Sequence, residues 1–179
     1  MTAQRTGRNA VPAPGRIRGT AAALVILALL QIYLGALVAG LRAGLIYNTW
    51  PLMDGRFVPD AARLWFDAPW WRNLFENTLT VQFDHRMVAY GLCVLALLHA
   101  ADAVTTRAGA RSALVLAAAV LLQACLGIIT LLNQAPLELA LLHQAGAVVV
   151  LIVTVVHAAG MAAERRVVPA RLHSMQAAR

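Results

Sequence analysis

The sequence contains no lysine, only two cysteines and few charged residues of any kind. Of its 179 residues, 13% are charged and 60% are hydrophobic, and the mean hydropathy is +0.68. Soluble domains carry about 25% charged residues and about half apolar ones, so this composition excludes a soluble enzyme and a disordered chain. Two cysteines are too few for a disulfide scaffold, and we expect Cys93 and Cys125 to be small buried apolar residues.

Long uncharged stretches are what the sequence has instead. They cover residues 19–41, 87–101, 112–137 and 139–163. A helix that crosses the hydrocarbon core needs about 20 apolar residues. Three stretches meet this length, and the second does so if His99 and Asp102 lie at its far end. We therefore predict an all-α integral membrane protein whose four transmembrane helices form a bundle. The predicted membrane domain is 19–163, flanked by tails at 1–18 and 164–179.

The arginines predict the orientation of these helices. Ten of the fifteen lie in 1–18, 102–111 and 164–179, with only two acidic residues beside them. The other five lie in 42–86, where five acidic residues balance them. The positive-inside rule then places both termini in the cytoplasm of a bacterial-type inner (cell) membrane, crossed several times. Because topology accounts for the net charge of +7, we expect lipid around the chain and no nucleic-acid partner.

An internal repeat divides the membrane domain into two similar helix hairpins. The segment LLQIYLG at 29–35 returns as LLQACLG at 121–127, and His85 and His99 are fourteen residues apart, as are His143 and His157. The first hairpin has a long outer loop at 42–86, and the second has a very short one. Parallel repeats of this kind pack about an axis along the membrane normal and form sites at their interface.

The four histidines are placed as two pairs. Fourteen residues advance a helix by about four turns, or about 21 Å, so both histidines of each helix lie on one face at opposite depths. His85 and His143 then meet near the outer surface and His99 and His157 near the cytoplasm. Two imidazoles on facing helices can ligate a haem iron axially, whereas zinc needs three or four ligands.

We accordingly predict His85 and His143 as axial ligands of a haem iron, with an interhelical hydrogen bond as the alternative role. For His99 and His157 the hydrogen-bonding role is favoured, because at the cytoplasmic interface water can satisfy their ring nitrogens. Binding of a second haem by His99 and His157 remains open at this point.

The long outer loop is aromatic and contains all four tryptophans and all four phenylalanines. Its tryptophans suit interfacial anchoring or a lid over a cofactor. Arg42, Arg72 and Arg86 could meet haem propionates, since arginine favours bidentate contacts with carboxylates, or they could pair with the acidic residues of the loop.

Four longer motifs make the sequence similar to a known protein family. They are Tyr47-Asn-Thr-Trp-Pro-Leu-Met-Asp-Gly55, Asn73-Leu-Phe-Glu-Asn77, Thr80-Val-Gln-Phe-Asp-His-Arg86 and His143-Gln-Ala-Gly146. With these motifs, residues 20–162 resemble the haem A synthase family. Members of that family have eight helices in two similar halves, and they oxidise the C8 methyl of haem O to the formyl group of haem A.

This chain resembles only the C-terminal half of the family. The resemblance implies that His85 and His143 hold haem b in this half. It also implies that haem O binds in the other half, where a glutamate three residues before a histidine is tied to catalysis. Here Gln82 and Ala140 stand at that spacing, and neither can accept a proton. We therefore expect no catalytic residue in this chain, and a haem O site on a missing N-terminal half or a partner chain.

Two function classes follow. The first is a haem A synthase, an oxidoreductase of haem biosynthesis and cytochrome oxidase assembly, of which this chain is the half that binds haem b; its activity alone and its oligomeric state are open. The alternative is a di-haem b-type membrane cytochrome for electron transfer, which would use all four paired histidines. A transporter or purely structural membrane protein has only the repeat in its favour and would bind no haem.

Overall fold

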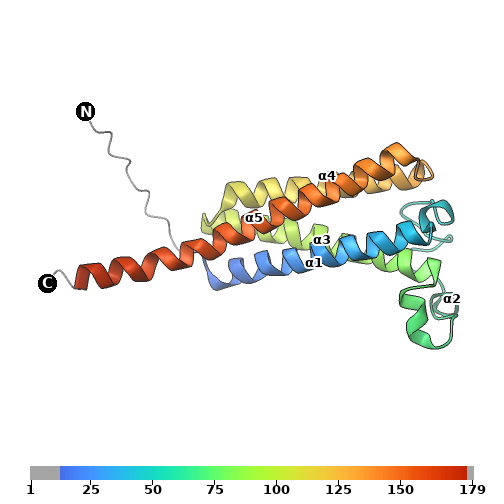
Figure 1. Cartoon of the computed structure of the whole chain (residues 1–179), viewed down its shortest axis with the longest axis horizontal. Helices are drawn as coiled ribbons and strands as arrows, with labels where there is room; N and C mark the ends of the chain where they lie inside the picture. Colours follow the sequence, from blue (N-terminus) through green and yellow to red (C-terminus); the bar gives the residue numbers. More distant parts are fainter. Residues whose placement is uncertain (1–12, 177–179) are drawn as a thin grey trace.

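Four long helices dominate the computed structural model, which describes residues 13–176 and the side chains of residues 13–163. These helices are α1 (Gly15–Gly40), α3 (Thr78–Thr106), α4 (Ala110–Leu132) and α5 (Leu137–Gln176) (Figure 1). The first three, and the Leu137–Ala163 part of α5, are long and apolar enough to cross a membrane. Because the described part of the chain contains no strand, the predicted all-α membrane bundle is confirmed.

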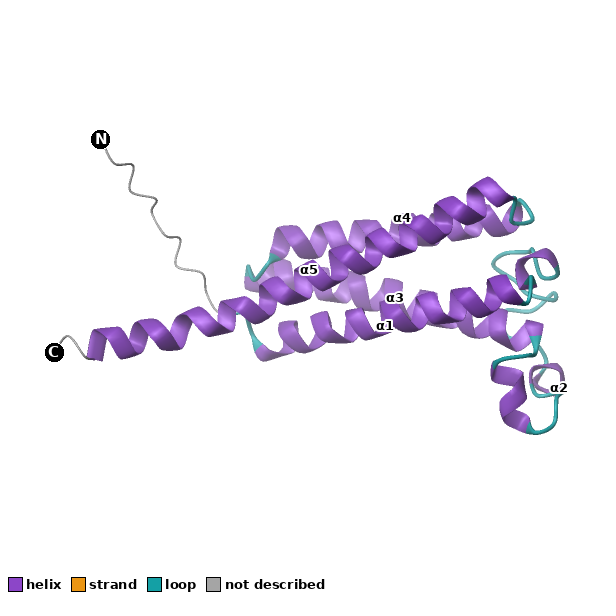
Figure 2. Ribbon diagram, in the orientation of Figure 1, coloured by secondary structure: helices purple, strands orange, loops and turns teal. Residues whose placement is uncertain are grey.

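The helices form two hairpins that pack side by side. A long connection joins α1 to α3, and a short turn joins α4 to α5 (Figure 2). Helices α1 and α4 each contact both α3 and α5, so α3 and α5 lie diagonally across the bundle axis. We call the end that carries the long connection the loop end, and the opposite end, where α1 begins, the terminal end.

The apolar core is concentrated at the terminal end. Its fully buried residues include Ile17 and Leu24 on α1, Ala96 on α3, and Ala113 and Leu116 on α4. Alanines let the helix backbones approach closely there. Among residues 121–149 of α4, α5 and their turn, by contrast, only Thr130 is fully buried. The two hairpins accordingly separate toward the loop end (Figure 2).

Helix α3 begins earlier than its hydropathy predicts. The uncharged stretch starts at Met87, but the helix starts at Thr78. Asn77 caps it, because its Oδ1 accepts hydrogen bonds from the N–H groups of Leu79 (3.0 Å) and Thr80 (3.4 Å). The first two turns are too polar for a hydropathy scan to include them, and His85 therefore lies well inside the helix.

The other boundaries also shift. Helix α1 starts within the predicted 1–18 tail, whose residues 1–12 lie outside the described part of the chain. Helix α5 continues through the predicted 164–179 tail as far as Gln176, and residues 177–179 are not described. The expected burial is wrong for Cys125, which lies exposed on α4, while Cys93 is half-buried. The hydropathy of one helix does not specify which of its apolar residues face the lipid and which face the other helices.

Two asparagines order the long connection, which also contains the 3-10 turns η1 (Ala43–Leu45) and η2 (Trp70–Leu74) and the short helix α2 (Ala61–Leu64). Asn73 is fully buried. Its Nδ2 donates to the carbonyls of Asp67 (2.9 Å) and Trp70 (2.8 Å), and its Oδ1 accepts from Nδ2 of Asn77 (3.0 Å). Thr80 of α3 donates to the carbonyl of Leu64 at 2.6 Å. These bonds attach the connection to the start of α3.

Candidate functional site

His85 of α3 lies at the loop end, held by a glutamine of the preceding helix. Gln31 Nε2 lies 3.0 Å from His85 Nδ1 and 3.2 Å from His85 Nε2, and it donates to the His85 backbone carbonyl at 3.1 Å. Gly35, one turn further along α1, faces the same ring, and a Cβ at Gly35 would lie 3.3 Å from His85 Cε1. The imidazole is therefore positioned by one side-chain amide and by the absence of one side chain.

His143 of α5 has the same surroundings in the second hairpin. Gln123 Nε2 lies 3.0 Å from His143 Nδ1 and donates to the His143 carbonyl at 2.7 Å. A Cβ at Gly127 would lie 2.7 Å from His143 Cε1, and a Cβ at Gly146 would collide with Gln123 Oε1. The LLQxxLG repeat of the sequence thus supplies the glutamine and the glycine that surround the histidine in each hairpin.

The second pair, His99 and His157, meets directly at the terminal end. Their Nε2 atoms are 2.7 Å apart, and their rings lie edge to face at 82° with centroids 4.9 Å apart. The side chains are only 1% and 3% exposed. The expectation that water satisfies their ring nitrogens is therefore wrong. The sequence indicates how deep each histidine lies along its helix, but it does not show whether the two rings contact each other.

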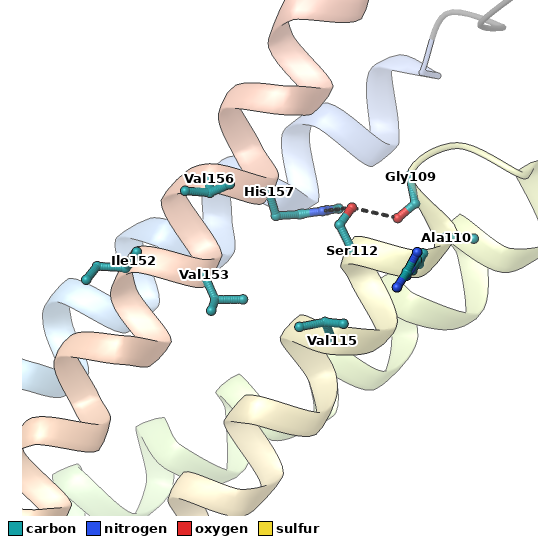
Figure 3. Close-up of a pocket in the computed structure, with 9 residues that line it drawn as sticks. Gly109, Ala110, Ser112, Val115, Ile152, Val153, Val156 and His157 are labelled. Carbon is teal, nitrogen blue, oxygen red and sulfur yellow. Dashed lines mark hydrogen bonds between the residues drawn. The ribbon is translucent and has the colours of Figure 1, made fainter. Parts of the chain in front are cut away.

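Two hydroxyl groups complete this pair. Thr20 Oγ1 of α1 lies 2.7 Å from His99 Nδ1, and Ser112 Oγ of α4 lies 2.8 Å from His157 Nδ1 (Figure 3). All four membrane-spanning helices thus contribute to one hydrogen-bonded chain. We call these four side chains the terminal histidine clamp. A groove of about 630 Å³ between α4 and α5 runs beside it, and its lining includes three valines, one isoleucine, Ser112 and His157 (Figure 3).

The clamp also determines where the loop-end histidines point. Because His99 and His157 meet across the bundle axis from diagonal helices, the faces of α3 and α5 that carry them point toward that axis. His85 and His143 lie fourteen residues away on the same faces, near the loop end where the hairpins separate. Both histidines are half-buried.

The donor set fits an axially ligated haem iron. Two imidazoles on diagonal helices are a known axial ligand pair, and the glycines beside them keep the rings uncrowded. Gln31 Oε1 is buried without a hydrogen-bond partner beside His85. Among the described residues no group of three or more His, Cys, Asp and Glu side chains could hold a metal ion, so zinc finds no site there.

Gln82 and Arg86 flank His85 and bind the long connection. Gln82 Nε2 and Arg86 Nη2 both donate to the Tyr47 carbonyl, at 3.0 and 2.8 Å, and Arg86 Nη1 donates to the Leu52 carbonyl at 3.5 Å. Arg86 is only 7% exposed. Two of its guanidinium nitrogens thus bind backbone carbonyls, whereas Nε is buried without a partner among the described residues.

Arg72 and Arg42 differ from Arg86 in their surroundings. Arg72 Nε donates to Glu76 at 2.9 Å, so the alternative of pairing with an acidic residue of the loop is confirmed for Arg72. This guanidinium holds the pKa of the Glu76 carboxyl below its usual value of 4.5. Arg42, at the start of η1, forms no ion pair with the described side chains.

Sequence reasoning missed four polar partners of the histidines, namely Gln31, Gln123, Thr20 and Ser112. A signal for them exists in the sequence. Thr20 and Gln31 are eleven residues apart in the first repeat, as are Ser112 and Gln123 in the second. Polar side chains that return at the same positions of two apolar helices indicate a shared role, since each would otherwise be unsatisfied in lipid.

The chain is similar to known proteins over most of its length. The family model described as cytochrome oxidase assembly protein matches residues 1–155. A protein of Bradyrhizobium diazoefficiens named heme A synthase is 58% identical over 170 residues, which are 90% of this chain and 47% of that protein. One of Rhodopseudomonas palustris strain TIE-1, also named heme A synthase, is 62% identical over 146 residues, or 80% of this chain and 40% of the relative.

The chain therefore spans less than half the length of these curated relatives. No solved structure matches it. The match with the family model covers most of the chain and includes both hairpins up to residue 155. The chain belongs to the haem A synthase family of cytochrome oxidase assembly proteins.

Proposed function

We propose that this chain is the haem b-binding half of a haem A synthase, with His85 and His143 as the axial ligands of the iron. The observation that carries this proposal is the matched environment of the two rings. Each lies on one of two diagonal helices, fourteen residues from a histidine of the clamp, and each is contacted at Nδ1 by a glutamine of its own hairpin.

The surroundings of the pair suit a cofactor that transfers electrons. When bound, haem b would pass electrons between the oxidation of haem O and an acceptor. The chain's own residues hold and orient the two imidazoles through the Gln31 and Gln123 amides. The ordered connection, fastened to α3 through Gln82 and Arg86, lies at the loop end, next to the pair.

The oxidation of haem O itself is assigned to residues outside this chain. Oxidation of a methyl group needs a proton acceptor close to the substrate. One turn before the two loop-end histidines stand Gln82 and Ala140, which have no carboxylate, and the Gln82 amide already donates to the Tyr47 carbonyl. We propose that the haem O site lies on an N-terminal half or a partner chain, and that both halves act in an inner membrane with the terminal end facing the cytoplasm.

The terminal histidine clamp argues against the alternative, a di-haem b-type cytochrome. An iron between two imidazole nitrogens separates them by about twice a metal–nitrogen bond of about 2.0 Å, or roughly 4 Å. The Nε2 atoms of His99 and His157 are 2.7 Å apart and hydrogen-bonded to each other. This closed contact supports a single haem per chain, at the loop end.

Alanine substitution of the four histidines tests the proposal. We expect His85→Ala and His143→Ala to abolish haem binding, measured by the pyridine haemochrome spectrum of the purified protein. His99→Ala and His157→Ala are the matched controls and should retain haem, provided that circular dichroism shows the same helix content. Retention of haem by the His85 and His143 variants would exclude these residues as ligands.

A further inference from the structure

We propose that Gln31 and Gln123 are positioning residues that select the ring nitrogen with which each axial histidine binds iron. This inference rests on the proposed function, since it concerns the haem that His85 and His143 would hold. It goes further by assigning a role in that site to two side chains that would not touch the iron themselves.

Each amide contacts its histidine at two points, which fixes the ring. Gln123 Nε2 reaches both Nδ1 (3.0 Å) and the backbone carbonyl (2.7 Å) of His143. Gln31 Nε2 reaches the same two groups of His85 at 3.0 and 3.1 Å, and it also lies 3.2 Å from His85 Nε2. The amide thus leaves Nε2 of His143 as the free ligating atom, and in His85 it lies nearer to Nδ1 than to Nε2. A hydrogen bond to the other ring nitrogen sets the orientation and basicity of a metal-bound histidine.

A glutamine amide suits this role because it has both a donor and an acceptor. In the present arrangement the amide donates to Nδ1, so the ring proton lies on Nε2. Ligation through Nε2 requires that proton to lie on Nδ1, and Nδ1 then needs an acceptor. Gln31 Oε1 is buried and has no hydrogen-bond partner among the described residues, so a turn of the amide can bring this oxygen to Nδ1, at the loss of the amide's bond to the His85 carbonyl. An apolar side chain would leave the Nδ1 proton unsatisfied in the membrane interior.

Glycine provides the space for this contact in the second hairpin. A Cβ at Gly146 would collide with Gln123 Oε1, so an alanine there must displace the amide. Gly160 lies on the same helix, and a Cβ there would meet nothing within 4 Å. The two glycines therefore offer a steric test of Gln123 that leaves Gln123 itself unchanged.

The test combines haem affinity with reduction potential. The haem-free protein in detergent is titrated with haemin, and the midpoint potential of the bound haem is measured. We expect Gln31→Leu and Gln123→Leu to weaken haem binding by about 10- to 100-fold and to raise the potential, because the ligand becomes less basic. Gln31→Glu and Gln123→Glu keep an acceptor and should retain binding with a lowered potential. Gly146→Ala should resemble Gln123→Leu, and Gly160→Ala the parent protein.

The outcomes separate this inference from the proposed function. One possible result is that the parent binds haem and His85→Ala loses it, while both leucine variants keep the affinity and potential of the parent. This result would overturn the role of the glutamines and leave the proposed function standing. A potential that moves equally in the leucine and glutamate variants would also overturn it, because the charge and basicity of the partner would then not matter. A parent protein that binds no haem would overturn both proposals.

Discussion

The terminal histidine clamp makes a non-additive prediction about stability. In His157→Leu, His99 keeps its bond to Thr20, but its Nε2 loses the partner that it has among the described residues, in a side chain that is only 1% exposed. Ser112 loses less, because its hydroxyl also donates to the Gly109 carbonyl at 2.9 Å. One buried polar atom is thus left unsatisfied, which costs about 1–3 kcal/mol of unfolding free energy. His99→Leu is expected to cost about as much, for the same reason.

The double variant removes the cost. With leucine at both histidine positions, Thr20 can still donate to the Arg16 carbonyl (3.0 Å) and Ser112 to the Gly109 carbonyl, so no polar atom of the clamp remains unsatisfied. Replacing both partners of a buried hydrogen bond by apolar groups is nearly neutral. We therefore expect the double variant to be more stable than the sum of the single losses predicts, by about 1 kcal/mol or more.

Reversible unfolding in mixed detergent micelles measures this coupling. Circular dichroism reports the loss of helix for the parent chain, the two single leucine variants and the double variant. Coupling between polar groups of membrane helices averages about 0.6 kcal/mol and reaches about 1.7 kcal/mol, so the expected value lies at the upper end of that range. Single losses that simply add in the double variant would refute the closed contact between His99 and His157.

Three further predictions concern the loop end and the connection. Gly127→Ala should displace the His143 ring and weaken haem binding, because the new Cβ would lie 2.7 Å from Cε1; a haemin titration measures this. Asn77→Ala should lower stability by about 0.5–2 kcal/mol through loss of the α3 cap, measured by the same detergent unfolding. Arg72→Gln should raise the pKa of Glu76 toward its usual value of 4.5, as followed by NMR titration. Since that pKa is lowered in the folded protein, the stabilisation by the Arg72–Glu76 pair should be present above pH 4.5 and disappear as the pH falls through the folded-state pKa. A stability difference between Arg72→Gln and the parent that is larger at low pH would contradict this prediction.

The sequence predicted the number of membrane helices and their grouping into hairpins, because long apolar stretches and a repeated segment follow directly from composition and order. It did not predict where α3 begins. Its first two turns are polar, and a side-chain cap at Asn77 rather than hydropathy determines its start.

For the histidines as well, the sequence predicts positions along the helices but not the contacts between side chains. The fourteen-residue spacing predicts that both histidines of a helix share one face, because helical periodicity determines direction, and the pairing of His99 with His157 agrees with the predicted alignment of α3 and α5. It did not predict that His99 and His157 close on each other, or that Gln31 and Gln123 hold Nδ1 of the other two rings. Such contacts depend on how closely four helices approach, which small residues at the terminal end determine and a single sequence does not specify.

The amount of haem bound per chain tests the central claim most directly. The purified protein is assayed by pyridine haemochrome spectrum against protein concentration, together with the four histidine variants. We predict one haem b per chain, lost in His85→Ala and His143→Ala and retained in His99→Ala and His157→Ala. No bound haem, or two haems per chain of which one depends on His99 and His157, would contradict the account.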